Sequence, residues 1–354
     1  VEGLNAWREE VGTNIQKMLT TPISGAVALD DTTLQIDLTR PRPQFLYALS
    51  MTFLSPTPEE LIVPAQNNLR EGTPGTGPFI LKKWTAQSEV ILDKNNYYNA
   101  SVTPKIDRIH FKIIPEGTTQ WLNFQKSKLD ILPLPKDEFS NAIAASGELK
   151  PELVSNNIKL MTGDSNIYWW FAFNMKHPIL GKNKKVRLAI ASAINRNEFI
   201  KLFTNNTGRL AGSLYPPGIF GFNENQKSPF NYDLNKAKEY LKQAGFADGA
   251  GLPEFVFDLR SNDTLGRQIG EFFQNEMKKI GIKVKIIPNT FAKFLEKLKQ
   301  DQLQIFFDGW SLDYPDSENI LTLLSSKNLP PGPNHSSFQN TEFDQLFSIT
   351  ETME

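Results

Sequence analysis

Gly309-Trp310-Ser311-Leu312-Asp313-Tyr314-Pro315-Asp316, which follows the apolar run Ile305-Phe306-Phe307, is the stretch around which the chain is organised. The apolar run predicts a buried strand, and the residues from Gly309 to Asp316 predict a turn. An indole offers a flat apolar face with one N–H donor, and an ionised Asp beside it can hold an ammonium group. On local pattern alone, the same residues also fit a strand end whose Trp310 fills the core and whose Asp313 opens a Pro turn.

The residues before this stretch alternate between strand and helix patterns. Strands are expected at residues 255–259, 282–287 and 305–310, and helices at residues 265–280 and 291–299. This β-α-β-α-β order predicts an α/β domain in which the carboxyl ends of parallel strands meet at one edge, where such sheets bind ligands. Arg260, Asn262 and Asp263 after one strand would then face a common crevice with Ser311–Tyr314 after another.

Ile167–Asn174 is the most aromatic segment of the chain. A continuous apolar run of this kind predicts a strand that is buried on both faces. Its Tyr and two Trp have polar tips that need partners, so the segment fits either core packing or a cleft wall. Helices are predicted after it at residues 184–194, 198–203 and 234–244, and a loop at residues 208–229.

Shorter elements are expected in the first part of the chain. The pattern predicts one amphipathic helix over residues 4–19, a hairpin with one buried face over 25–38, a second hairpin over 79–93, and a β-α-β unit with parallel pairing over 106–132. The Pro-rich stretch 55–78 predicts a long loop and a domain boundary. Its Gly72–Pro78 segment predicts a structural turn, because the Lys-Ser/Thr of a phosphate-binding loop is absent.

Composition excludes several classes of protein. The 354 residues suffice for about two domains, and 38 basic against 39 acidic residues give no global field that favours nucleic acid or anionic lipid. The chain has no cysteine, which removes disulfides, thiolate zinc sites and cysteine nucleophiles. No apolar run approaches the roughly 20 residues of a membrane span. No signal peptide is visible and the chain opens at Val1, which favours a processed chain or a fragment.

The residues that carry catalysis in common enzymes do not form a recognisable pattern. His110, His177 and His335 are far apart and match no metal spacing or triad. The carboxylates of Asp313, Asp316 and Glu318 fit a hard cation or, more simply, a solvated loop and helix start. The sequence therefore favours a binding protein over an enzyme, with no metal or cofactor expected.

Five motifs in order resemble one known family. They are Gly75-Thr76-Gly77-Pro78-Phe79 with Lys83-Trp84, Lys94-Asn95-Asn96-Tyr97-Tyr98, residues 185–196 (KVRLAIASAINR), Asp233–Lys238 with Ala244-Gly245-Phe246, and Gly309–Tyr314. Together they resemble the family 5 extracellular solute-binding proteins, which are oligopeptide and dipeptide receptors of ABC importers. The resemblance covers nearly the whole chain, but the family's N-terminal part with its leader and its C-terminal return strand have no counterpart in the sequence.

The resemblance implies an α/β, two-lobed, periplasmic-binding-protein-like architecture of the class II type, with a hinge and a small extra domain. Residues 1–68 would be part of small domain II, residues 69–168 part of domain I, and residues 169–354 domain III. The ligand would be enclosed between domains I and III. The implied protein is a monomeric, non-catalytic receptor that passes a short peptide to an ABC permease. It would be periplasmic or at the cell surface, with a lipid anchor as an option.

The resemblance also implies roles for single residues. Asp313 lies where peptide-binding relatives hold the peptide's α-ammonium, and Arg260 where dipeptide-binding relatives carry an Arg for its carboxylate, which a guanidinium binds bidentately. Phe173 and Asn174 lie where the backbone pairs with an extended peptide. Trp310 and Tyr314 complete the expected ligand-binding set.

Two departures from the family leave the ligand open. Phe307 and Leu265 stand where some oligopeptide receptors have an Arg and a His that hold longer peptides. Relatives in the family also bind nickel chelates, haem or sugars, so a non-peptide solute stays an alternative. A hydrolase is a further alternative, opposed only by the absence of catalytic motifs.

Overall fold

A computed structural model describes residues 1–58 and 75–353 of the chain. It divides into two compact units, Val1–Glu138 with the residues from Thr352 onward, and Phe139–Glu351. The expected division into residues 1–68, 69–168 and 169–354 stays a prediction, and Gly72-Thr73-Pro74 and most of the expected loop 55–78 lie outside the described residues.

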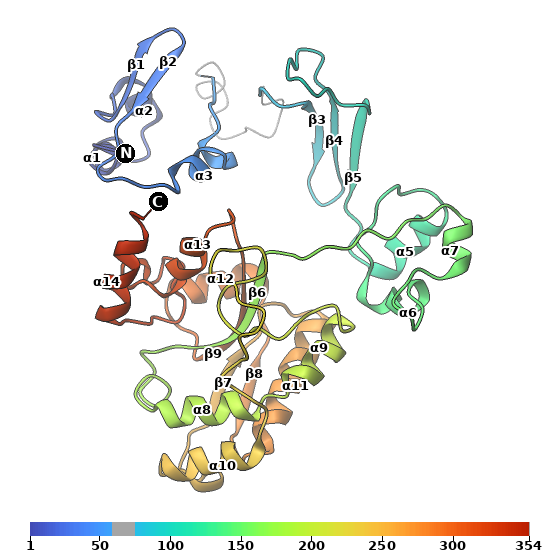
Figure 1. Ribbon diagram of the computed structural model, residues 1–354, viewed down its shortest axis with the longest axis vertical. Coiled ribbons are helices and arrows are strands. Elements are labelled where there is room, and N and C mark those ends of the chain that lie inside the picture. Colours follow the sequence, from blue (N-terminus) through green and yellow to red (C-terminus); the bar gives the residue numbers. More distant parts are fainter. Residues whose placement is uncertain (59–74, 354) are drawn as a thin grey trace. The chain divides into compact units, whose positions relative to one another are not determined.

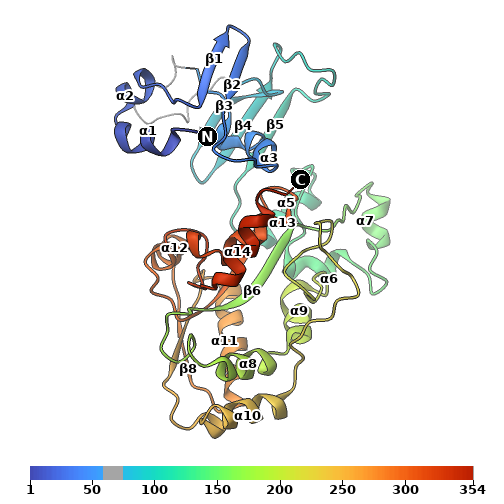
Figure 2. The same cartoon turned by 60° about the vertical axis from the view of Figure 1, so that its left-hand side comes forward.

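The first unit contains short helices and two small antiparallel sheets, which can be followed in Figure 2. Its elements are α1 (Leu4–Val11), α2 (Ile15–Thr20), β1 (Ala26–Asp30), β2 (Thr33–Ile36), α3 (Phe45–Leu49), η1 (Thr52–Leu54), β3 (Phe79–Thr85), β4 (Glu89–Lys94), β5 (Arg108–Lys112), α5 (Gly117–Gln125) and η2 (Lys136–Glu138).

The single helix expected over residues 4–19 is wrong, because α1 and α2 are separate helices. Gly12 ends α1 with a positive φ of 52°, a conformation that glycine adopts without strain. Asn14 then starts α2, and its side chain accepts a hydrogen bond of 3.0 Å from the Lys17 N–H. A C-terminal Gly and an N-cap Asn within three residues therefore interrupt a continuous apolar pattern.

Both predicted hairpins are confirmed, since β1 pairs with β2 and β3 with β4 in antiparallel register. The first hairpin lacks the expected buried face, because most of its side chains are exposed. The parallel β-α-β unit at 106–132 is wrong: β5 pairs antiparallel with β4, and residues 129–132 form no strand. Two cross-strand side-chain contacts hold β5 on β4, an ion pair of Arg108 with Asp93 at 2.6 Å and a contact of His110 with Glu89 at 2.7 Å.

The second unit is an α/β layer structure (Figure 1). Its elements are α6 (Phe139–Ala142), α7 (Pro151–Ser155), β6 (Ile167–Phe173), α8 (Lys184–Ala193), α9 (Arg196–Thr204), α10 (Leu234–Gln243), η3 (Ala247–Gly249), β7 (Phe255–Asp258), α11 (Thr264–Lys278), β8 (Val284–Ile287), α12 (Phe291–Lys299), β9 (Ile305–Ser311), α13 (Ser317–Leu321), η4 (Thr322–Leu324), η5 (Ser326–Asn328) and α14 (Thr341–Thr350).

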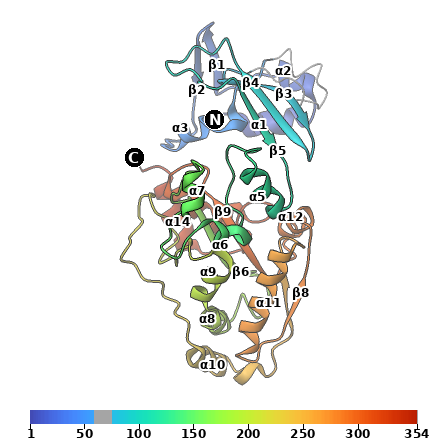
Figure 3. The ribbon, with the colours of Figure 1, turned by 90° about the vertical axis from the view of Figure 1, so that its right-hand side faces the viewer.

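The four strands of this unit have the order β6-β9-β7-β8. β7 runs parallel to both β8 and β9, as the β-α-β-α-β pattern predicts, and β6 runs antiparallel to β9. Helices α8, α10 and α11 supply buried side chains that pack with β7, β8 and β9, whereas α12 packs against the other face through Phe294 and Leu298. Figure 3 shows α8, α9, α10 and α11 gathered beside the sheet.

The expectation that the aromatic strand is buried on both faces is wrong. β6 is an edge strand that pairs with β9 alone among the described residues. Its N-terminal part is open to solvent, with Ile167 42% and Trp169 50% exposed, whereas Ala172 is buried. The apolar run therefore reflects one packed face and an aromatic surface at the strand's start.

Candidate functional site

The site begins where β7 stops and β9 continues. Asp258, the last residue of β7, lies opposite Phe306, so residues 307–311 of β9 extend beyond β7 and keep only β6 as a strand partner. Both strands present their carboxyl ends here, at the edge where parallel α/β sheets bind ligands. The end of β7 thus lies beside β9, as expected from the parallel order of the strands.

The hydrogen bonds of the ladder show which backbone groups this edge exposes. The Leu312 N–H donates to the Asn166 carbonyl and the Asn174 N–H to the Gln304 carbonyl, each at 2.9 Å. Because antiparallel pairs alternate between bonded and non-bonded positions, the even-numbered residues of β9 face β6. The backbone groups of Phe307, Gly309 and Ser311 therefore point to the other side. The Phe307 N–H pairs with β7 and the Gly309 N–H donates to Asp308, so the carbonyls of Phe307 and Gly309 and the backbone of Ser311 are the groups left past the end of β7. An extended chain can add to such an edge.

Arg260 lies beside this edge, two residues after β7. Its Nη1 is 3.7 Å from Oδ1 of Asp308, and its guanidinium carbon is 5.1 Å from the ring centroids of both Trp169 and Phe291. Nη1 is buried and has no hydrogen-bond partner among the described residues. Aromatic faces hold a guanidinium without using its N–H groups, so Arg260 retains donors for a planar anion.

Asp308 is a buried carboxylate at the centre of this site, with 5% of its surface exposed. Oδ1 accepts from the Gly309 N–H at 2.9 Å, and Oδ2 is 2.8 Å from Nδ1 of His335. Neither Asp308 nor His335 was among the site residues expected from the sequence. The signal that could have pointed to Asp308 is a carboxylate inside an apolar strand.

Trp310 and Asp313 are held by one buried residue, Asn319 of α13. Its Oδ1 accepts from the Trp310 indole N–H at 2.9 Å and from the Asp313 backbone N–H at 3.1 Å. Asn319 is 4% exposed, whereas the Asp313 side chain is exposed and its carboxylate has no partner among the described residues. The backbone at Asp313 is therefore fixed while its carboxylate stays accessible. Asn319 was not expected from the sequence, because its role depends on the fold.

The neighbouring polar residues have local roles. Tyr314 donates its hydroxyl hydrogen bond to Glu318, and Asp316 caps α13 by accepting from the Glu318 N–H at 2.8 Å. The described residues contain no group of three or more His, Cys, Asp or Glu that could hold a metal ion. The reading of Asp313, Asp316 and Glu318 as loop and helix-start residues fits these bonds.

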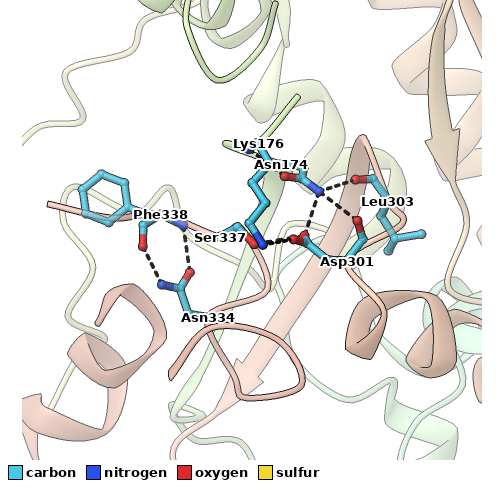
Figure 4. A network of polar contacts seen from close by, with 7 residues as sticks. All are labelled: Asn174, Lys176, Asp301, Leu303, Asn334, Ser337 and Phe338. Atoms are coloured by element: carbon cyan, nitrogen blue, oxygen red, sulfur yellow. Dashed lines mark hydrogen bonds and ion pairs between the residues drawn. The ribbon is translucent and has the colours of Figure 1, made fainter. Parts of the chain in front are cut away.

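Phe173 and Asn174 lie at the far end of β6, because Phe173 pairs with Ile305 at the start of β9. Figure 4 shows the Asn174 amide among Asp301 and Leu303. Its Nδ2 donates to Asp301 Oδ1 at 2.8 Å and to the Leu303 carbonyl at 2.9 Å, and its Oδ1 accepts from the Lys176 N–H at 2.8 Å. The Asn174 side chain is thus used within the fold, away from Arg260 and Asp313.

In the part of the chain that the structure describes, no helix has both the length and the apolar character to cross a membrane.

Comparison with known proteins identifies relatives over most of the chain. The dipeptide-binding protein of Escherichia coli strain K12 is 28% identical over 334 residues, 92% of this chain and 60% of that protein. Heme-binding protein A of Haemophilus influenzae is 28% identical over 332 residues, 90% of this chain and 57% of that protein. The chain thus spans less than two thirds of the length of these curated relatives.

A solved structure has the same fold. The periplasmic binding protein DppA of Helicobacter pylori, in complex with the peptide STSA, matches with a TM-score of 0.78 and 27% identity over 93% of this chain and 63% of that one. This likeness confirms the expected α/β fold of a periplasmic binding protein. A family model described as bacterial extracellular solute-binding proteins, family 5 Middle, matches residues 4–329, and the chain therefore belongs to the family 5 bacterial extracellular solute-binding proteins.

Proposed function

We propose that this protein is the extracytoplasmic receptor of an ABC importer and that it binds a short peptide without chemical change. The observation that carries the proposal is the open edge of β9, which has Arg260 beside Asp308 at one end and the accessible carboxylate of Asp313 at the other. Support also comes from the dipeptide-binding relative of Escherichia coli and from DppA with its bound peptide.

The proposed binding mode uses one group for each part of a peptide. Asp313 accepts from the α-ammonium, and Arg260 donates two N–H groups to the terminal carboxylate. The carbonyls of Phe307 and Gly309 and the backbone of Ser311 pair with the peptide between them. Trp310 and Tyr314 supply aromatic surface near the ammonium end. Each group binds a feature that all peptides share, so the site selects length more than sequence.

The spacing of the two charged residues favours a short ligand. Asp313 follows Asp308, the neighbour of Arg260, by five residues, which is at most about 16 Å of extended chain. The two side chains shorten that gap, and about two to four peptide residues at roughly 3.3 Å each fill what remains. Phe307, which replaces a possible second carboxylate-binding Arg, fits the same preference.

The cellular setting is inferred from the family. A receptor of this kind works outside the cytoplasm, in the periplasm or tethered to the cell surface by a lipid anchor, and delivers its ligand to a membrane permease. We infer a monomer, since one chain carries both charged groups of the site. Phe173 and Asn174 lie at the other end of β6, opposite the start of β9, and take no part in this binding mode.

A second candidate ligand is haem, because Heme-binding protein A of Haemophilus influenzae is also a relative. Trp169 and Phe291 are 50% and 49% exposed and flank Arg260, an arrangement that suits a flat macrocycle with carboxylates. The peptide remains the first choice because haem has no ammonium group for Asp313.

Calorimetric titration of the protein separates these candidates. Di-, tri- and pentapeptides are compared with forms that are N-acetylated or C-amidated, and haemin binding is followed by its absorbance. We expect the shorter free peptides to bind most tightly and both modifications to weaken them. If haemin binds and no peptide does, haem is the ligand. Sustained cleavage of fluorogenic peptides would show that the protein is a hydrolase and not a receptor.

A further inference from the structure

The contacts of Arg260 indicate which residues determine how tightly it binds the carboxylate of the ligand. Its Nη1 stands 3.7 Å from Asp308, close enough for attraction but beyond hydrogen-bond length. Asp308 is thus near Arg260 without using up its donors. The inference below rests on the proposed function, because it concerns the same carboxylate-binding guanidinium.

The two carboxylate oxygens of Asp308 contact different partners. Oδ1 faces Arg260 and accepts from the Gly309 N–H, whereas Oδ2 is 2.8 Å from Nδ1 of His335. A buried carboxylate is costly unless it is paired, and here two cationic or potentially cationic side chains lie on its two sides. A change of charge on one of these side chains alters how strongly Asp308 attracts the other.

His335 can exchange protons with solvent. Its side chain is 22% exposed and lines a cavity of about 260 Å³ beside β6, together with Tyr168 and Trp170. The charged groups around it are Asp308 of β9, Arg260 beyond Asp308, and Arg187 of α8, which lines the same cavity. A histidine ordinarily changes its charge between pH 5 and 8.

We propose that Asp308 links Arg260 to His335 and that the charge on His335 determines how much of the Arg260 charge is left for the ligand's carboxylate. When His335 is neutral, Asp308 cancels most of the field of Arg260. When His335 is protonated, it compensates Asp308 and Arg260 becomes an uncompensated cation. Ligands with a free carboxylate therefore bind more tightly at pH 5.5 than at pH 7.2, by about fivefold for charges roughly 9 Å apart in a partly solvated site.

The reciprocal effect has the same sign. A bound carboxylate stabilises the protonated form of His335, so binding takes up protons, and proton uptake on binding means tighter binding at lower pH. Substituting Asp308→Asn removes the cancelling charge. That variant binds a free-acid peptide at pH 7.2 about as tightly as the wild type does at pH 5.5.

The test is calorimetry of the full chain with a dipeptide and its C-terminal amide at pH 5.5 and 7.2. His335→Asn keeps an N–H donor near the place of Nδ1 but cannot become charged, so we expect its ratio of affinities at the two pH values to fall to near one. His110→Gln removes another histidine that pairs with a carboxylate, Glu89 at 2.7 Å, and should keep the wild-type ratio. For the C-terminal amide, the ratio of affinities at pH 5.5 and 7.2 should be the same in the wild type and in His335→Asn.

The outcomes separate this inference from the proposed function. If no peptide binds at either pH, the proposed function fails and the inference fails with it. If peptides bind but the wild type, His335→Asn and Asp308→Asn share one pH ratio, the proposed function stands and Asp308 is only a structural carboxylate. Thermal unfolding of each variant checks that the fold is kept, and His335→Gln repeats the comparison if His335→Asn does not fold.

Discussion

The indole of Trp169 lies against Gly309 on the neighbouring strand, so closely that a Cβ atom on Gly309 would stand 2.4 Å from the ring. The two residues are direct partners in the pairing of β6 with β9. The same ring stacks on Phe307 with centroids 5.4 Å apart and an angle of 11°. A glycine at this position lets Trp169 lie flat over the open edge, where its face meets Arg260.

Gly309→Ala should therefore overpack the edge. We expect a loss of about 1–3 kcal/mol in the free energy of unfolding, because the strand and the indole must separate. Urea denaturation followed by circular dichroism measures the loss. Gly163→Ala is the matched control, since nothing lies within 4 Å of its added Cβ. Equal stability of the two variants would show that Trp169 moves away without cost.

Asp313→Asn should weaken peptide binding by about 10- to 100-fold, the usual effect of removing a hydrogen bond to a charged group. The loss should vanish with N-acetylated peptides, which have no ammonium group. Calorimetry gives both affinities. Glu254→Gln is the control, because it removes an exposed charge just before β7, at the opposite end of the strand. Unchanged affinity in Asp313→Asn would remove this residue from the site.

Asn319→Ala should affect stability and binding together. It removes the acceptor of both the Trp310 indole N–H and the Asp313 backbone N–H, and an unsatisfied buried donor costs about 1–3 kcal/mol. Without Asn319, the turn that carries Asp313 is no longer fixed, so the preference for free over N-acetylated peptides should also decrease. Chemical denaturation and calorimetry measure the two effects, with the exposed Asn225→Ala as control. A loss of stability with full retention of that preference would show that Asp313 does not depend on Asn319.

Most of the second unit could be predicted from the sequence because its signals are local. Capping side chains mark the helix starts, as with Asp233 of α10, Asp263 of α11 and Thr290 of α12, each of which accepts a hydrogen bond from a backbone N–H in the first turn. The apolar runs between these helices form the expected strands. Local hydrogen bonds and periodicity thus determine the order of elements.

The site could be predicted only in part, since its central contacts join distant residues. The position of Arg260 beside β9, the strand that leads to Asp313, could be predicted from the parallel order of β7 and β9. The pairing of Asp308 with His335 spans 27 residues and depends on where the loop after η5 returns. The exposure of Trp169 depends on β6 lying at an edge, which the composition of an apolar run does not reveal.

Asn174→Ala should destabilise the fold more than it changes ligand affinity. Its side chain joins Asp301, Leu303 and Lys176 in the network of Figure 4, and its loss leaves buried polar groups without partners. We expect a decrease of about 2 kcal/mol in the free energy of unfolding. Asn156→Ala, at the end of α7, should cost less. A large fall in peptide affinity at normal stability would instead give the Asn174 side chain a direct role in binding.

His177 should make the protein less stable as the pH falls. Burial lowers the pKa of His177 because it disfavours the imidazolium. Its Nδ1 also accepts from the Ile179 and Leu180 N–H groups at 3.3 and 3.2 Å, which requires the neutral ring. The unfolded chain has the ordinary value of about 6.5, so below that pH it binds the proton more readily than the folded chain does. Stability is therefore complete above about pH 6.5 and is lost as the pH falls through the lowered pKa of the folded state.

The variant His177→Asn isolates this effect. Its Oδ1 can accept from the same two N–H groups, as in an Asx turn, but has no proton to gain. Thermal unfolding between pH 5 and 7.5 should show a smaller loss of Tm toward pH 5 in His177→Asn than in the wild type. Parallel curves for the wild type and His177→Asn would mean that the folded protein accommodates the charged ring, so that burial at His177 is not what makes stability depend on pH.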